Sequence, residues 1–256
     1  MPQATIRSIY RYPVKGLSAQ ELPRVALAAG ETLPVDRAYA IANGFDEFDP
    51  ARPAFVPKQR FLMLMKNERL AALDTRFDEA TQTLCIAENG GEAARGDLRT
   101  GEGRTVIEAF FTRYCAKELR GPLKVLHADN FSFADAAGKF VSIINLASVA
   151  AIEDLVGAPV DPLRFRGNLY VTGWPAWHEF DLVGQTIAIG EKVRLRVSRR
   201  IERCAATNVD PVTGIRDINI PRALFQRFDH ADCGIYTEVV AAGEIAVGDA
   251  VMGEQM

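Results

Sequence analysis

Short apolar runs separated by turn residues dominate this sequence, and they limit the chain to folds built mainly from β-strands. The first third contains several such runs, separated by turn chemistry such as Asn43-Gly44. Similar runs return in the last third of the chain. The predicted strands are residues 6–12, 22–27, 37–42, 70–77, 83–87, 168–172, 186–189, 193–197 and 234–241.

Two segments have helical periodicity instead. Residues 101–119 carry apolar side chains at helical spacing, which predicts one amphipathic helix. A second helix is predicted over residues 146–156, with Asn145 or Ser148 near its start and Gly157 after its end. Because the helices are few and the strands many, we predict an α+β fold that is mostly β and rich in barrels.

Composition excludes several classes of protein. The 256 residues are 48% hydrophobic and 25% charged, as in globular proteins, and the net charge of -3 gives no general attraction to nucleic acid or anionic lipid. The longest uncharged apolar stretch, residues 140–152, is shorter than the roughly 20 residues that cross a bilayer. No secretory signal precedes the first strand. We therefore expect a cytoplasmic protein without nucleic-acid or membrane partners.

Common cofactor motifs are missing from the sequence. It contains no GxGxxG, no P-loop and no HExxH. The four cysteines, Cys85, Cys115, Cys204 and Cys233, form no CxxC pair, so we expect free thiols. Three of them read as small packing groups. Cys204 is the exception because of its neighbours.

A basic strand leads directly to Cys204. Between residues 192 and 203, six cations accompany a single carboxylate, Glu202. One interpretation is a solvated strand face. The other is that the strand aims Arg203 and Cys204 into an anion-binding site, where nearby cations favour a thiolate that attacks electrophiles or binds soft metals.

The residues around this cysteine resemble those of the MOSC proteins, named after the C-terminal domain of molybdenum cofactor sulfurase. The resemblance spans nearly the whole chain and is closest to the amidoxime-reducing branch, without an iron-sulfur domain. Its segments are Tyr12-Pro13-Val14-Lys15-Gly16, Asp36-Arg37, Phe165-Arg166-Gly167-Asn168, Trp177-His178-Glu179, Arg203-Cys204-x-x-Thr207-x-Val209-Asp210-Pro211-x-Thr213-Gly214, and Gly243-x-Ile245-x-Val247-Gly248-Asp249.

The resemblance implies an N-terminal β-barrel domain over residues 1–122 and a MOSC β-barrel domain over residues 123–256. It also implies a molybdenum-molybdopterin cofactor whose metal is held by Cys204. Lys15 and Arg37 match positions that hold the cofactor's phosphate. The other expected cofactor-binding residues are Ser148, Arg166, Asn168, Arg203, Thr207 and Asn208. Gly16 replaces the serine usual after the lysine and so removes one hydroxyl from the expected phosphate contacts.

Three functions remain open. The first is a molybdenum-cofactor-dependent oxidoreductase that reduces N-hydroxylated or N-oxide small molecules. Its electrons would come from a separate ferredoxin or flavoprotein, because no cysteines are spaced for an iron-sulfur cluster. The second is a sulfur carrier with a Cys204 persulfide, loaded by a cysteine desulfurase that holds the pyridoxal phosphate. The third is a cofactor-binding module without turnover.

Overall fold

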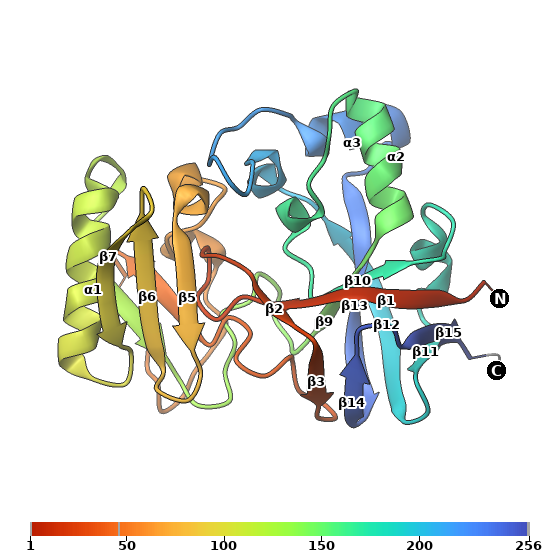
Figure 1. The fold of residues 1–256 in the computed structure, drawn as a ribbon, viewed down its shortest axis with the longest axis horizontal. Coiled ribbons are helices and arrows are strands. Elements are labelled where there is room, and N and C mark those ends of the chain that lie inside the picture. Colours follow the sequence, from red (N-terminus) through yellow and green to blue (C-terminus); the bar gives the residue numbers. More distant parts are fainter. Residues whose placement is uncertain (1, 46, 255–256) are drawn as a thin grey trace.

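The chain is mostly β, with three α-helices among the residues described. A computed structural model describes residues 2–45 and 47–254. A large barrel with two helices above it lies at one end, and a small sheet with the remaining helix lies at the other (Figure 1). None of the helices in these residues is long and apolar enough to cross a membrane. The predicted fold class, mostly β with few helices and a closed barrel, is confirmed.

Seven strands close the barrel. Pairing between the first and the last strand of the series completes the ring, so the barrel has no open edge. In order around the ring, the strands are β10 (Leu169–Thr172), β9 (Val141–Asn145), β13 (Asp232–Ala241), β12 (Val193–Glu202), β11 (Thr186–Ile189), β15 (Ala250–Gly253) and β1 (Ala4–Arg11).

Strand β12 shows why this sequence forms the barrel wall. Val193, Leu195 and Val197 are almost completely buried, while the residues between them face outward. Each buried aliphatic side chain contributes roughly 1.5–3 kcal/mol relative to an exposed one. The alternation that predicts this strand therefore also sets which face carries the arginines. Two irregularities in its pairing with β13 lie near the end of β12, just before Cys204.

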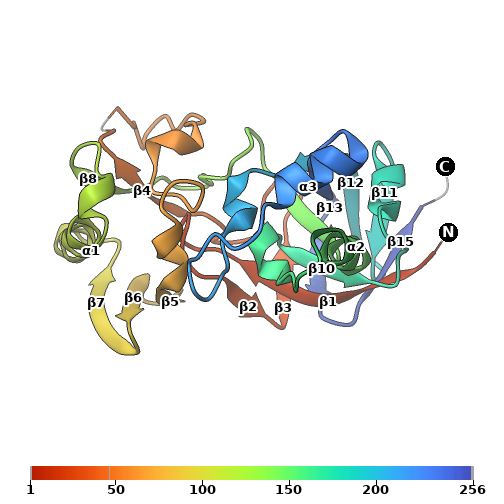
Figure 2. The same ribbon diagram turned by 90° about the horizontal axis from the view of Figure 1, so that it is seen from above.

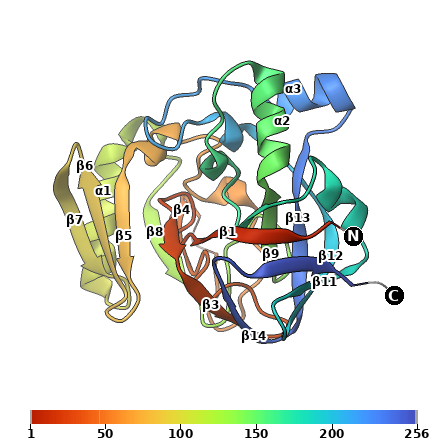
Figure 3. The ribbon, with the colours of Figure 1, turned by 45° about the vertical axis from the view of Figure 1, so that its right-hand side comes forward.

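The strand pairings connect the two halves of the sequence. β1 pairs with β10 and β15, so the first strand of the chain lies within the barrel (Figure 3). Conversely, β8 (Leu123–His127) pairs with β4 (Tyr39–Asn43), outside the barrel. Short β2 (Gln20–Leu22) pairs antiparallel with the end of β1, and β3 (Arg24–Leu27) pairs with β14 (Gly243–Ala246). The division of the chain at residues 122 and 123 stays a prediction.

The end opposite the barrel has its own core. β5 (Asp74–Asp78), β6 (Thr83–Glu88) and β7 (Gly91–Asp97) form a three-stranded antiparallel sheet. Helix α1 (Gly101–Tyr114) contacts β7 and β8, and Figure 2 shows it at this end of the molecule. The Thr100 side chain caps the helix by accepting a hydrogen bond from the Gly103 N–H. A short 3₁₀ turn, Ala116–Glu118, follows the helix.

Two more helices lie over the barrel. Helix α2 (Leu146–Val156) begins at the Asn145 cap and ends before Gly157, as predicted, and lies in the crossover between the parallel strands β9 and β10. Helix α3 (Ile220–Phe228) is not predicted from the sequence. The segment 70–77, predicted as one strand, begins within a 3₁₀ turn (Glu68–Ala72) and becomes extended only at Asp74.

Candidate functional site

A cavity of about 620 Å³ lies where the N-terminal segments meet the end of β12. This size is typical of sites for small molecules and cofactors. Eight cationic and four acidic side chains line it, a local excess of positive charge in a chain whose net charge is -3. Of the predicted site residues, seven line the cavity, namely Lys15, Arg37, Arg166, Asn168, Arg203, Cys204 and Thr207.

Cys204 lies between the end of β12 and the 3₁₀ turn Ala205–Asn208. Its side chain is partly exposed, and its thiol lies beside the Lys58 ammonium. The Thr207 N–H and hydroxyl both donate to the Cys204 carbonyl, each at 3.0 Å, and this fixes the turn after the cysteine. In residues 2–45 and 47–254, no three His, Cys, Asp or Glu side chains gather into a metal-binding group.

Lys15 is buried at the floor of the cavity. Its ammonium donates to the Phe133 carbonyl at 2.7 Å and forms a short ion pair with Asp135. Burial lowers the pKa of Lys15, against the opposing effect of the Asp135 carboxylate. Gly16 has φ +83°, and a β-carbon there would lie 3.1 Å from the Leu62 carbonyl oxygen. The positive φ and this close contact both favour glycine at position 16 over a residue with a β-carbon.

Two guanidinium groups share the ring of Tyr12. The centre of the Arg166 guanidinium lies 4.1 Å from the ring centroid, and that of Arg37 lies 4.5 Å from it. Arg37 forms an ion pair with Asp36 and donates to the Arg166 carbonyl at 2.8 Å. The Nη2 atom of Arg166 is buried and has no hydrogen-bond partner among the described residues. Burial, reinforced by the Arg37 charge, lowers the pKa of Arg166 to about 10.

A buried guanidinium nitrogen without a hydrogen-bond acceptor is costly unless an anion supplies one. Arg166 therefore indicates where in the cavity an anion would be bound. Both arginines have left-handed backbone conformations, with φ +52° at Arg37 and +49° at Arg166, which is unusual for residues other than glycine. Such conformations are held by surrounding structure and are frequent at functional sites.

Arg203 and Asn168 line the cavity, but their polar groups hold its wall together. The Arg203 guanidinium donates to the carbonyls of Cys233 and Phe165. Asn168 accepts from the Ser142 N–H at 3.0 Å and donates to the Tyr10 carbonyl at 3.2 Å, joining β9 to β1. These two residues therefore shape the site more than they offer free donors to a ligand.

Ser148 and Asn208 lie outside the cavity lining. The Ser148 hydroxyl lies 2.8 Å from one carboxylate oxygen of Glu179 and accepts from the Trp177 N–H. Glu179 is fully buried, and burial raises its pKa. Asn208 accepts from the Ile220 N–H at 3.1 Å, at the start of α3. Both side chains serve local structure because their hydrogen bonds run to neighbouring elements rather than to the cavity.

Sequence reasoning missed three residues of the site: Tyr12, Lys58 and Asp135. The Asp135 carboxylate contacts both Lys15 and Lys58, the latter at 3.4 Å. Partial burial alone would raise the pKa of Asp135, but the two ammonium groups hold it at about 2. Asp135 and Cys204 raise the pKa of Lys58 against the opposing effect of burial. No signal in the sequence connects Lys58 with Asp135, since 77 positions separate them.

The loop that follows Cys204 is held by a buried arginine. Arg164 donates to Asp217 at 2.8 and 2.7 Å and to Asp210 at 3.2 Å. Asp210 in turn accepts from the Thr213 N–H and hydroxyl, each at 2.8 Å, which accounts for the Asp210-Pro211-x-Thr213 spacing in this turn. This arrangement fixes the cysteine loop against the segment that carries Arg166.

The other three cysteines differ from Cys204 in their surroundings. Cys115 and Cys233 are buried, and burial raises the pKa of each to about 12. Cys85 lies on β6, with its thiol 3.1 Å from a carboxylate oxygen of Glu92, and burial and this contact raise its pKa. Their thiols stay protonated at neutral pH, so they are packing groups rather than nucleophiles.

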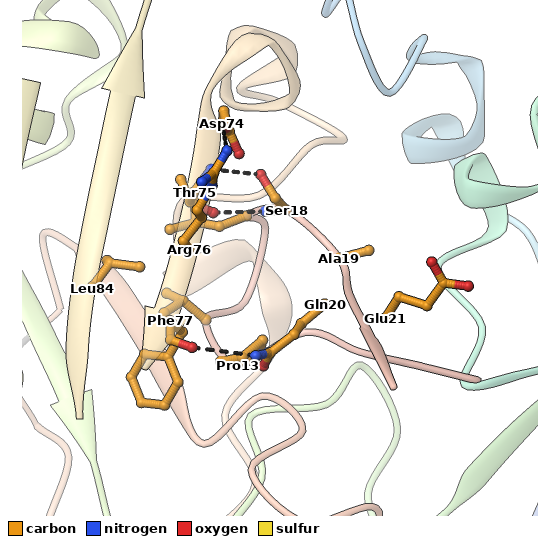
Figure 4. Close-up of a pocket in the computed structure, with 12 residues that line it drawn as sticks. Pro13, Ser18, Ala19, Gln20, Glu21, Asp74, Thr75, Arg76, Phe77 and Leu84 are labelled. Carbon is orange, nitrogen blue, oxygen red and sulfur yellow. Dashed lines mark hydrogen bonds and ion pairs between the residues drawn. The ribbon is translucent and has the colours of Figure 1, made fainter. Parts of the chain in front are cut away.

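A second pocket of about 360 Å³ lies behind the segment that carries Lys15. Figure 4 shows Ser18 and Gln20 facing β5, with dashed lines to Thr75 and Phe77. Ser18 also donates to the Leu73 carbonyl at 2.9 Å. None of the predicted site residues lines this pocket. Its hydrogen bonds anchor the chain just after Lys15 and leave the charged cavity as the candidate site.

Comparison with known proteins finds a family match for part of this chain and two similar solved structures. The family model of the MOSC domain matches residues 128–252. No curated protein matches the chain. Among solved structures, the YuaD protein from Bacillus subtilis is similar over 100% of both chains, with 14% identity and a TM-score of 0.47. YiiM from Geobacillus stearothermophilus matches 45% of this chain and 54% of its own, with 19% identity and a TM-score of 0.35.

Proposed function

Residues 128–252 match the MOSC domain family, and from this premise we propose that the chain is a molybdenum-cofactor-dependent oxidoreductase. MOSC domains generally bind the molybdenum cofactor. The proposed substrates are small N-hydroxylated compounds or N-oxides, and the proposed electron source is a separate ferredoxin or flavoprotein, as in the amidoxime-reducing branch. The observation that carries the proposal is the meeting of Cys204 with Lys15, Arg37 and Arg166 around one cavity.

The residues present suit this cofactor. Its phosphate needs cationic donors, and the buried Nη2 of Arg166 is a donor without an acceptor among the described residues. The buried ammonium of Lys15 supplies a second cation. Cys204 offers a partly exposed thiol, and a thiolate is a suitable ligand for a soft metal centre. The cavity volume of about 620 Å³ lies within the range of cofactor sites.

Each residue then has a defined task. Cys204 would hold the metal, while Lys15, Arg37 and Arg166 would bind the phosphate end of the cofactor. Arg203 and Asn168 keep the cavity wall in place through hydrogen bonds to carbonyl groups of neighbouring segments. When bound, the cofactor supplies two-electron redox chemistry, and the protein supplies ligation, orientation and charge compensation.

An anaerobic turnover assay tests the proposal. Protein produced in a host that makes the cofactor is mixed with a reduced viologen and an N-hydroxylated amine, so that R–NHOH, two electrons and two protons give R–NH₂ and water. We expect turnover by the wild type and by Cys115→Ala, and a loss of at least a hundredfold in Cys204→Ala. Equal turnover by Cys204→Ala, or none by molybdenum-loaded wild type, contradicts the proposal.

A sulfur carrier is the second candidate, favoured by the partly exposed Cys204 thiol beside the Lys58 ammonium. In this role the Cys204 thiolate takes the terminal sulfur of a desulfurase persulfide and frees the desulfurase thiolate. The transfer needs neither Lys15 nor Arg166. To distinguish a sulfur carrier from an oxidoreductase, Lys15→Met is incubated with a cysteine desulfurase and cysteine and then analysed by mass spectrometry. Only a sulfur carrier should keep a labile extra sulfur on Cys204 in this variant.

A further inference from the structure

We propose that Asp135 is an internal competitor for the anion site, and that an incoming phosphate group must displace its carboxylate from Lys15 and Lys58. The inference deepens the proposed function, on which it rests for the identity of the natural ligand. The exchange itself involves only side chains of this protein and any phosphate that enters the cavity. It makes Asp135 a residue that sets the affinity of the site.

The contacts of Asp135 place it among the cations proposed to bind phosphate. One carboxylate oxygen contacts Lys15, and the other lies 3.4 Å from Lys58. The Lys15 side chain is 6% exposed, whereas that of Asp135 is 46% exposed. The carboxylate therefore covers a buried ammonium from the open side of the cavity. A ligand that enters from that side meets Asp135 before it meets Lys15.

The segment that carries Asp135 can release it with little disruption. Phe133 is buried, and its N–H donates to the Arg37 carbonyl at 2.8 Å, which anchors the chain just before Asp135. Beyond this anchor, residues 134–139 form no helix or strand, and within the described chain they make no backbone hydrogen bond. Movement of the carboxylate therefore breaks two side-chain ion pairs but no backbone hydrogen bond.

Charge favours a phosphate over the carboxylate. Asp135 carries one negative charge, and the two ammonium groups keep its pKa at about 2, so it competes as an anion at every physiological pH. A phosphate group carries up to two charges and three acceptor oxygens, and its charge-assisted hydrogen bonds are strong. It can also satisfy the Nη2 atom of Arg166. The exchange is thus favourable, but weaker than binding to a site without Asp135.

Calorimetric titration with inorganic phosphate tests the proposal on the full chain, purified without molybdenum cofactor. We expect Asp135→Asn and Asp135→Ala to bind phosphate at least tenfold more tightly than the wild type. Asp129→Asn is the matched control, because Asp129 is an exposed acid in the same connection between β8 and β9. The dissociation constant of Asp129→Asn for phosphate should equal that of the wild type. Lys15→Met should lose phosphate binding both in the wild-type chain and in the Asp135 variants.

Unchanged or weaker phosphate binding in both Asp135 variants, with the wild-type melting transition retained, overturns the proposal. Asp135 would then be a structural partner of the lysines. If only Asp135→Asn destabilises the fold, Asp135→Ala still decides the question. The titration contains no molybdenum, so its result does not depend on the proposed function. The Asp135 variants can bind phosphate more tightly even if the turnover assay fails, and turnover can be observed even if phosphate binding is unchanged.

Discussion

At the scale of single residues, the site concentrates more cations than its acidic side chains neutralise. Tyr12 carries a guanidinium within 4.1 Å and another within 4.5 Å of its ring centroid. Arg166 also keeps a buried Nη2 without a partner among the described residues. Like charges in a buried place reduce stability unless an anion lies between them. Such local destabilisation is expected at sites maintained for binding.

The substitution Arg166→Met should therefore separate stability from binding. It removes a half-buried charge whose pKa is lowered to about 10, and replaces it with a shorter, apolar side chain. We expect the ligand-free protein to gain about 1 kcal/mol in free energy of unfolding, measured in urea, and to lose at least tenfold in phosphate affinity. A variant that is less stable and still binds phosphate normally would assign Arg166 a structural role.

Where a sequence motif is continuous, its residues lie together at the cavity. Arg203-Cys204-x-x-Thr207 lines the cavity as one stretch, and Lys15 and Arg37 reach it from the N-terminal part. Lys58 and Asp135 could not be predicted, because their proximity depends on how distant segments pack. Ser148 and Asn208 are expected cofactor-binding residues, yet their hydrogen bonds run to Glu179 and Ile220 instead.

At the scale of elements, an ion cluster holds the loop after β12 in place. Arg164, buried to 98% of its side chain, bridges Asp210 and Asp217. The hydrogen bonds from Arg164 hold the pKa of Asp217 below its usual value. Breaking a buried ion pair leaves one charge without its partner. The Asp217 side chain is 43% exposed, however, so water screens part of its interaction with Arg164.

This cluster predicts a pH dependence of stability. Because the folded pKa of Asp217 is lowered, its contribution is present above the unfolded pKa of about 3.9 and is lost as pH falls through the folded value. We expect Asp217→Asn to cost about 1 kcal/mol at pH 6 and progressively less as the pH falls below about 3.9. Urea denaturation at several pH values measures this, with the exposed Asp74→Asn as control; a pH-independent difference would contradict it.

Elements were predicted best where periodicity was strong. Residues 186–189 and 146–156 form the strand and the helix expected of them. Helix α3 was missed, although Asn219 caps it and Ile220 and Leu224 form its buried face, because nine residues give only two such positions. The strand predicted over 70–77 starts late because a 3₁₀ turn buries Leu70 instead.

At the scale of the whole molecule, the site depends on the joining of both ends of the chain. β1 completes the barrel, and the chain then continues directly to Lys15. Figure 1 shows the two ends of the chain at the same end of the molecule, where Ala4 pairs with Val251. The family resemblance implies two consecutive barrel domains, whereas the period of an apolar run cannot reveal which strands pair and so could not place β1.

A fragment of residues 123–256 should therefore fail to fold on its own. Without β1, the edges of β10 and β15 are left unpaired, which favours aggregation. A second fragment with residues 2–13 attached behind its C-terminus through a glycine-rich linker should recover a cooperative melting transition, since the two ends lie close together. Cooperative melting of the first fragment would show that β1 is dispensable and that residues 123–256 fold as a unit.

The central claim is that the Cys204 thiolate holds the molybdenum of a cofactor whose phosphate binds the cations of this cavity. Its most direct measurement is the molybdenum content per chain, by elemental mass spectrometry of the purified protein from a cofactor-producing host. We predict about one molybdenum per chain in the wild type and in Cys115→Ala, and at most a tenth of that in Cys204→Ala. Equal molybdenum in Cys204→Ala, or none in the wild type, would contradict the account.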